Sequence, residues 1–156
     1  MQGKTSPSLH RKLGDHPFVK ARPPKSTGRE EFGVEFLKHM VRLGSSLSKL
    51  DLLATAAELT AYCVYDNYRR FIEKKTKLDE LIVSGGGAHN EAIMSGLQKY
   101  FRSMPVRKID EYGISADAKE ALCFAFLANE TISGNPSNVP SVTGAKQPTV
   151  LGKICL

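Results

Sequence analysis

The residues best suited to chemistry are three consecutive glycines, Gly85, Gly86 and Gly87, which follow the apolar stretch 80–84 and precede Asn90. Because glycine has no Cβ atom, a ligand can approach such a backbone closely. A helix that follows would present free N–H groups and a partial positive charge, which suit a phosphate. Asn90 would serve there as a helix N-cap or as a ligand contact. A tight turn between a strand and a helix explains the glycines equally well, and the run matches neither the P-loop nor the dinucleotide pattern.

Two shorter stretches are further candidates for binding. Lys25, Ser26 and Thr27 place a cation and two hydroxyls before an expected helix, where they could contact a phosphate or cap the helix. Glu120 falls in the first turn of an otherwise apolar helix, a position that the helix dipole also favours for a carboxylate. The polar stretch 134–145 is too broken for core packing and long for a loop without a role.

The four histidines and three cysteines do not indicate a metal site or a nucleophilic enzyme. No pair has the spacing of zinc ligands, and neither a Gly-x-Ser-x-Gly stretch nor a Cys/His pair for nucleophilic attack is evident. Cys63 and Cys123 fall within apolar runs, so we expect buried, reduced thiols. This cysteine usage favours a cytoplasmic protein, and no apolar run is long enough to span a membrane.

The formal net charge of +6 raises the question of nucleic acid. Much of the positive excess lies in residues 1–29, and a second basic group covers 69–77. Aromatic side chains that could stack on bases are not interleaved with these cations. The charge pattern is therefore more typical of a solvated face, or of a site for a phosphorylated small ligand.

A chain of 156 residues suits one domain with one hydrophobic core. Residues 1–29 show no periodic apolar pattern, which predicts an extended or loop segment ahead of a domain over 30–156. Thr27 followed by Glu30 predicts a capping box at a helix start. Residues 150–155 could form a closing strand or a docked terminus.

Strands and helices alternate through the middle of the chain. Apolar residues recur at helical spacing from Leu50 to Phe71, which predicts a long helix. The short apolar runs around 82 and 107 are typical of buried strands. The predicted order is a helix at 30–43, a helix at 48–75, a strand at 80–84, a helix at 90–100, a strand at 106–109 and a helix at 117–134. This alternation favours an α/β layer with parallel strands flanked by helices.

Several of these stretches, taken in order, resemble the C-terminal half of the anhydro-N-acetylmuramic acid kinases. The resemblance rests on residues 16–18, 23–30, 85–90, 117–126 and 136–145. Each stretch is short, and their combination is specific. The fungal levoglucosan kinases are similar in the proline-lysine and glycine stretches and less so in the tail.

The resemblance implies one lobe of the actin-like ATPase fold, a ribonuclease-H-like sheet flanked by helices. Enzymes of this family use ATP and Mg²⁺ to open the 1,6-anhydro bridge and phosphorylate the sugar, which gives N-acetylmuramic acid 6-phosphate and ADP. By resemblance, residues 85–87 and Asn90 contact the nucleotide, and 25–27 lie near the cleft as further nucleotide contacts. Glu120 matches a position that contacts the anhydrosugar.

Two motifs of the family have no match in these 156 residues. One is a Gly-Thr-Ser-x-Asp-Gly phosphate loop, and the other is a Phe-Asp-Thr-Gly-Pro-Gly-Asn segment near the general base. Phosphate positioning and proton abstraction need these groups, so no catalytic or metal residue is assigned. We expect that the N-terminal lobe is absent and that the chain alone has little kinase activity.

Three other hypotheses stay open beside a muramic-acid kinase lobe. The chain could belong to an enzyme of the levoglucosan kinase kind, be a non-catalytic module that binds nucleotide or sugar, or be an adaptor for an acidic partner. Loss of a lobe would uncover apolar surface, so self-association is also expected.

Overall fold

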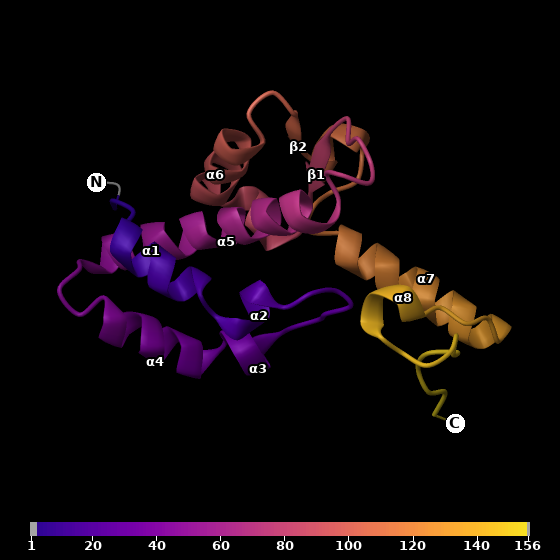
Figure 1. Ribbon diagram of the computed structural model, residues 1–156. Helices are drawn as coiled ribbons and strands as arrows, with labels where there is room; N and C mark the ends of the chain where they lie inside the picture. Colours follow the sequence, from indigo (N-terminus) through magenta and orange to yellow (C-terminus); the bar gives the residue numbers. More distant parts are fainter. Residues whose placement is uncertain (1–2, 156) are drawn as a thin grey trace.

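The computed structural model describes residues 3–155, which form helices and one two-stranded parallel sheet that lies beside α5 and α6 (Figure 1). The elements are, in order, α1 (Pro7–Gly14), α2 (Pro17–Lys20), α3 (Arg29–Phe32), α4 (Val34–Leu43), α5 (Lys49–Phe71), β1 (Leu81–Val83), η1 (Gly86–His89), α6 (Glu91–Phe101), β2 (Val106–Lys108), η2 (Ile109–Tyr112), α7 (Lys119–Ser133) and α8 (Pro140–Thr143). The expected α/β class is therefore confirmed, with a small sheet.

Helix α5 runs through the centre of the molecule, and apolar clusters lie on two sides of it (Figure 1). The helix begins as predicted, because the Ser48 Oγ accepts a hydrogen bond from the Asp51 N–H at 3.1 Å. It ends at Phe71, short of the predicted end near residue 75. The first cluster joins α5 to α1 and α4, and the second joins it to α6 and the sheet. Their buried members are Leu9, Leu13, Met40, Leu52 and Leu59 in the first, and Ala61, Leu97 and Phe101 in the second.

The prediction that residues 1–29 are extended is wrong for 7–14 and 17–20, which are helical. In α1 the Ser6 Oγ accepts from the Leu9 N–H, and Pro7 occupies the first helical position, where its missing N–H costs nothing. Leu9 and Leu13 are 2% and 1% exposed, one helical turn apart on the face that packs against α5. Packing of this face stabilises a helix that is otherwise polar.

The helix predicted at 30–43 is divided at Gly33 into α3 and α4. A Cβ atom at Gly33 would lie 2.1 Å from the Arg29 carbonyl oxygen, so the backbone approach there excludes any side chain. The capping box predicted from Thr27 does not form either, since Gly28 is the N-cap of α3 and no side chain caps it.

The two strands pair in parallel with Leu81 opposite Val106, Ile82 opposite Arg107 and Val83 opposite Lys108. The crossover between them is α6, which packs on α5 and covers one face of the sheet. The two helices lie close together at Gly96, where a Cβ atom would come 2.9 Å from the Ala61 Cβ. The sheet and its crossover thus rest on the second half of α5.

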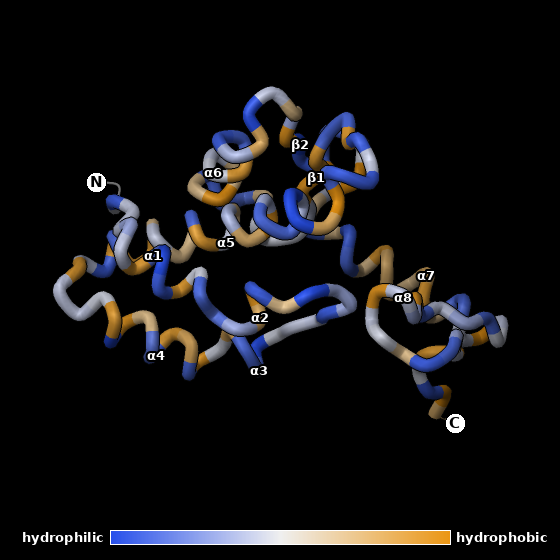
Figure 2. Tube along the Cα trace, viewed as in Figure 1, coloured by the Kyte–Doolittle hydropathy of each residue, from blue (hydrophilic) through white to orange (hydrophobic). Residues whose placement is uncertain are grey.

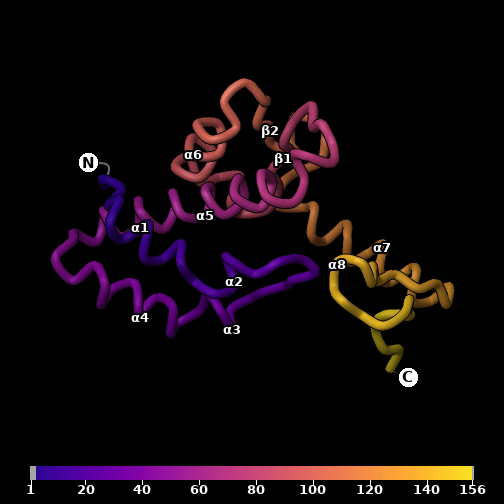
Figure 3. Tube along the Cα trace, in the orientation of Figure 1, coloured from indigo at the N-terminus to yellow at the C-terminus, as the bar shows by residue number. Residues whose placement is uncertain are grey.

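Residues 117–155, here called the C-terminal arm, extend from the rest of the molecule (Figures 1 and 3). Helix α7 ends as predicted at Gly134, whose φ of 72° is left-handed. Apolar residues line much of α7, yet none of its residues is buried (Figure 2). Residues 150–155 form no strand and are exposed; they contact α7 at Thr131, whose hydroxyl donates to the Leu151 carbonyl at 2.5 Å.

Between residues 3 and 155, no helix combines the length and the apolar character that a membrane crossing requires.

Candidate functional site

The glycine turn, residues 84–90, joins the end of β1 to the start of α6. Gly85 has a φ of 75° and an extended ψ, a conformation that strains any residue with a Cβ atom. Asn90 is the N-cap of α6, and its Oδ1 accepts from the N–H groups of Ala92 at 3.0 Å and Ile93 at 3.2 Å. Of the two roles considered for Asn90, the structure shows the cap.

Gly86 and Gly87 have no packing reason to be glycine. A Cβ atom built on either residue would meet no other atom within 4 Å. As the first two residues of η1, they also have N–H groups without a partner inside that helix. The turn therefore offers open space next to backbone N–H groups for which no acceptor lies within residues 3–155.

A cavity of about 460 Å³ lies beside the glycine turn and separates it from the start of α7. Ser84, Gly85 and Gly86 form one wall, while Asp117, Lys119 and Glu120 contribute the polar groups of the other. The structure thus brings together two predictions that are far apart in sequence, the glycines and Glu120. Gly87 and Asn90 do not line this cavity, and Asn90 faces a neighbouring hollow against α5.

One polar contact ties the two walls together. The Nε2 of His89, at the end of η1, lies 2.8 Å from the Oδ1 of Asp117, just before α7. Both side chains are largely exposed. Both residues lie within stretches that carry the family resemblance, 85–90 and 117–126, but neither was predicted to contact a ligand or the other. The helix predicted to begin at Asp117 begins at Lys119, and no side chain caps it.

The cysteines differ from their prediction in one respect. Cys63 is half-buried, and burial raises the pKa of its thiol, as expected of an inert reduced cysteine. Cys123 is exposed and forms part of the cavity wall, so the prediction that it is buried is wrong. The apolar run around it belongs to α7, which lacks a covering layer.

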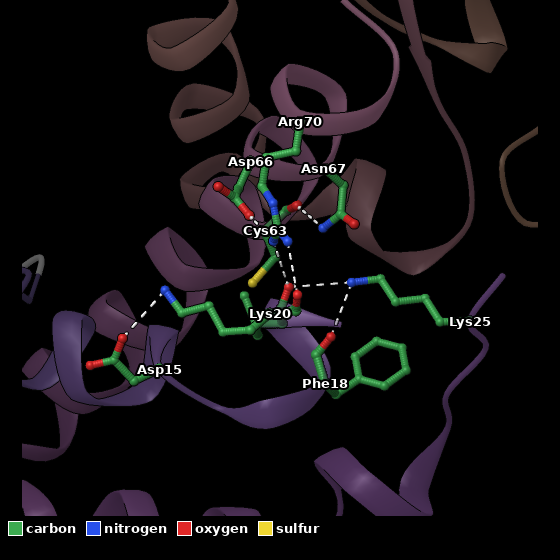
Figure 4. A network of polar contacts seen from close by, with 9 residues as sticks. Asp15, Phe18, Lys20, Lys25, Cys63, Asp66, Asn67 and Arg70 are labelled. Carbon is green, nitrogen blue, oxygen red and sulfur yellow. Dashed lines mark hydrogen bonds and ion pairs between the residues drawn. The ribbon is translucent and has the colours of Figure 1, made fainter. Parts of the chain in front are cut away.

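Lys25 is partly buried and contacts the end of α2 rather than the cavity (Figure 4). Its Nζ donates to the carbonyl oxygens of Phe18 at 3.0 Å and Val19 at 3.3 Å. Arg70 joins it, donating to Val19 at 3.1 Å and Lys20 at 2.8 Å. These carbonyls end α2, where cations are favoured. Burial first, and then the Arg70 charge, lower the pKa of Lys25.

Lys25, Ser26 and Thr27 line a separate hollow of about 500 Å³, whose wall is mostly apolar and includes Leu81 and Phe101. This hollow lies beside β1, whereas the glycine turn follows the end of that strand. The structure does not bring residues 25–27 and the glycine turn into one cavity. A nucleotide role for the three residues stays a prediction.

A metal ion would need several hard ligands in one place, and residues 3–155 contain no group of three His, Cys, Asp or Glu side chains that could hold one. The acidic groups at the cavity, Asp117 and Glu120, belong to neighbouring turns of one segment. Residues 3–155 therefore show no preformed Mg²⁺ site.

Comparison with known proteins agrees with the resemblance. The family model of anhydro-N-acetylmuramic acid kinase matches residues 1–156. A relative of that name from Salinibacter ruber is 46% identical over 139 residues, which is 88% of this chain and 35% of the relative. A relative from Clostridioides difficile is 42% identical over 153 residues, which is 98% of this chain and 40% of the relative.

A third relative, from Caldanaerobacter subterraneus, is 41% identical over 157 residues, which is 99% of this chain and 40% of the relative. The chain thus spans less than half the length of the curated relatives that it matches. Because the family model matches residues 1–156 and the three relatives are 41% to 46% identical over at least 88% of the chain, the chain belongs to the anhydro-N-acetylmuramic acid kinase family.

Proposed function

We propose that this chain supplies nucleotide and anhydrosugar contacts to an ATP-dependent 1,6-anhydro-N-acetylmuramic acid kinase, as part of one lobe of an actin-like ATPase fold. The observation that carries the proposal is the cavity shared by Gly85, Gly86 and Glu120. A kinase must hold a phosphorylated nucleotide and an alcohol next to each other, and this cavity sets a backbone with open approach opposite a carboxylate.

The nucleotide lies, in this proposal, against the glycine turn. The open space at Gly86 and Gly87 admits a bulky group, and their free N–H groups are donors for its polar atoms. The N–H groups of Ala92 and Ile93 are already used by Asn90, so the start of α6 contributes less. Asn90 acts chiefly by fixing the angle at which the turn enters that helix.

The sugar lies on the side of α7, where the Glu120 carboxylate can accept hydrogen bonds from hydroxyl groups. Lys119 places a positive charge at the same wall, which suits the phosphate that passes between the two ligands. When bound, Mg²⁺ would offset the phosphate charge. Since the described residues show no metal cluster, we assign it no ligand on this chain.

The chain alone is expected to bind nucleotide and sugar without catalysing phosphoryl transfer. The family's phosphate loop and its segment near the general base have no match in the 156 residues, and phosphoryl transfer requires both functions. Purified chain with ATP, Mg²⁺ and 1,6-anhydro-N-acetylmuramic acid should release ADP no faster than a blank. Release at the rate of a full-length relative would refute this part of the proposal.

Calorimetry with ADP tests the nucleotide site directly. The Cβ atom that Gly86→Val adds would meet no protein atom within 4 Å, and Gly86 lines the cavity, so we expect the fold to survive. We expect ADP affinity to fall by about tenfold or more, which corresponds to roughly 1.4 kcal/mol, with a smaller loss for Gly86→Ala. Equal heats for parent and Gly86→Val would remove the glycine turn from the site.

A second titration separates the sugar site from the nucleotide site. Glu120→Gln keeps the size of the side chain and removes its charge, so it should weaken binding of 1,6-anhydro-N-acetylmuramic acid and leave ADP binding unchanged. Heat with levoglucosan in place of the muramic sugar would favour an enzyme of the levoglucosan kinase kind. Binding of ADP with no response to either sugar would favour a nucleotide-binding module.

A further inference from the structure

The C-terminal arm has few polar contacts with the rest of the molecule, and none of its residues is buried. Apart from local bonds to Ser115, the one hydrogen bond that the described residues show between the arm and the preceding chain joins Asp117 to His89. Farther along the arm, Gly144 approaches Pro24. At the start of α7, the separation from the glycine turn therefore depends on the pair of His89 and Asp117.

Both members of this pair follow a buried alanine. Ala88 is fully buried and Ala116 is 2% exposed, so packing fixes the backbone before each side chain. The Ala116 N–H also donates to the Asp110 Oδ1 at 3.3 Å, which ties the start of the arm to η2. Side chains that leave a fixed backbone lose only their own rotamer freedom when they pair. The contact of 2.8 Å between His89 and Asp117 is therefore prepared by the fold on both sides.

The pair is expected to contribute little to stability. The side chains of His89 and Asp117 are 51% and 77% exposed, and water weakens exposed ion pairs. A carboxylate only accepts hydrogen bonds, so the His89 Nε2 carries the shared hydrogen, and it can donate from a neutral or a charged ring. The contact is thus better suited to holding two surfaces at one distance than to holding the fold together.

The pair also lies at the edge of the candidate site. Asp117 lines the cavity, His89 lines the neighbouring hollow against α5, and Gly86 lines both. Lys119 and Glu120 follow Asp117 in the first turn of α7 and form the polar wall opposite the glycines. A movement of α7 about its start would therefore change the distance from the Glu120 carboxylate to the glycine turn.

We propose that His89 is a positioning residue, which holds Asp117 and thereby sets the distance between the glycine turn and Glu120. The inference rests on the proposed function, in which the nucleotide lies against one wall of the cavity and the sugar against the other. Each ligand alone needs only its own wall. The two together need walls at a fixed separation, because reacting groups must be held at a productive distance.

The first test measures the separation of the walls without any ligand. Nitroxide labels are attached at exposed positions of α6 and α7 through Ser95→Cys and Ala128→Cys, in a chain whose native cysteines are replaced by alanine. Circular dichroism confirms that the labelled chain is folded, and pulsed electron spin resonance gives the distribution of distances between the labels. In His89→Ala, where the contact is lost, we expect a distribution about twofold wider than in the parent.

Further variants show whether the hydrogen bond itself is responsible. His89→Gln places an N–H donor at a similar reach and should restore the narrower distribution, whereas Asp117→Ala should widen it as His89→Ala does. Combining the two alanine changes should add nothing, because the residues act through one contact. The matched control is Lys38→Ala, which breaks an exposed ion pair of 2.7 Å with Glu35 on α4 and should leave the distances unchanged.

The second test uses calorimetry with ADP and 1,6-anhydro-N-acetylmuramic acid. ADP alone should bind His89→Ala as it binds the parent. The sugar should bind the ADP-loaded variant about three- to fivefold more weakly, because the pair cannot bias the arm by more than its own free energy. His89→Gln should recover most of that affinity. A variant that is merely destabilised would lose affinity for both ligands together.

The two tests separate the inference from the proposed function. Equal distance distributions in the parent and His89→Ala would overturn the inference whatever the chain binds, and so would a His89→Gln variant as wide as His89→Ala. A parent chain that binds neither ligand would refute the proposed function, and the distances alone would then decide whether His89 holds the walls. Equal losses of ADP and sugar affinity in His89→Ala would make His89 a ligand contact and overturn its positioning role.

Discussion

Helices α5 and α7 are both rich in apolar residues, and they differ in what surrounds them. Five residues of α5 are buried between α1 and α4 on one side and α6 on the other, whereas α7 has none. Both helices nevertheless begin and end close to where local signals place them. Capping and spacing are sufficient to define a helix, but the stability of a helix comes from the layer that covers it.

The largest expected difference is between equivalent truncations in the two helical layers. Leu97 is 3% exposed in the cluster between α5 and α6, and Leu97→Ala should cost about 3 kcal/mol of unfolding free energy. Leu122 on α7 is 58% exposed, and Leu122→Ala should lower the unfolding free energy by less than about 0.5 kcal/mol. Urea denaturation measures both. Similar losses would mean that α7 is covered in solution.

An added methyl group tests how tightly α5 and α6 are packed. Gly96→Ala places a Cβ atom 2.9 Å from that of Ala61, which is fully buried. We expect a net loss of about 1–2 kcal/mol even though alanine favours the helix. Gly87→Ala is the control, because its Cβ atom would enter open space. Thermal unfolding measures the stability of both variants. A Gly96→Ala variant more stable than Gly87→Ala would contradict the tight packing of α5 and α6.

A pH series tests the polar part of the same interface. The Glu58 Oε1 accepts from Tyr100 OH at 2.8 Å and from Lys99 Nζ at 3.0 Å. Burial acts to raise the pKa of Glu58, but these hydrogen bonds outweigh it, and the pKa lies below its usual range. A carboxylate with a lowered pKa stabilises the fold above its unfolded pKa, near 4.3, and this contribution is lost as the pH falls through the folded pKa.

Glu58→Gln should therefore lower stability by about 1 kcal/mol at pH 7, and the difference from the parent should vanish at more acidic pH. Tyr100→Phe removes one of the two donors and should show part of the effect. Denaturant unfolding at a series of pH values measures both variants. A difference that stays constant with pH would exclude the carboxylate as its source.

The smallest effect concerns the C-terminal arm. The Thr131 hydroxyl joins α7 to the Leu151 carbonyl, and Thr131→Val removes that bond while keeping the shape of the side chain. The change should free residues 150–155 without altering unfolding of the rest of the chain. Limited proteolysis should cut the variant sooner near its C-terminus. Unchanged cleavage would mean that other contacts hold the segment.

The parts of the fold that could be predicted depend on local signals. Ser48, Asn90 and Gly134 act as caps within a few residues of their partners, and the apolar spacing of α5 spans several turns. The missed helix α1 shows the limit of this reasoning. It carries only two buried leucines, and their burial depends on α4 and α5, which follow much later in the chain.

In the candidate site, too, features that depend on local sequence could be predicted and those that depend on distant residues could not. The glycine turn was found because its residue types are unusual in sequence. Glu120 was noted as a carboxylate in the first turn of an apolar helix, and only the family resemblance linked it to the sugar. The position of Lys25 could not be predicted, because its environment depends on Arg70, at the far end of α5. The break at Gly33 also depends on a close backbone approach that residue types do not reveal.

The side chains of Gln98 and Glu111 accept hydrogen bonds from the outward N–H groups of β2, which limits how many strands the sheet can gain. Fibrous aggregates grow because each added strand presents a new edge to the next, on both sides of the stack. Here the outer edge of β2 is already terminated, so the sheet can gain at most one strand, next to β1. Even two copies meeting edge to edge would form a closed pair. The edge of β1 that faces away from β2 can therefore stay exposed without starting a polymer.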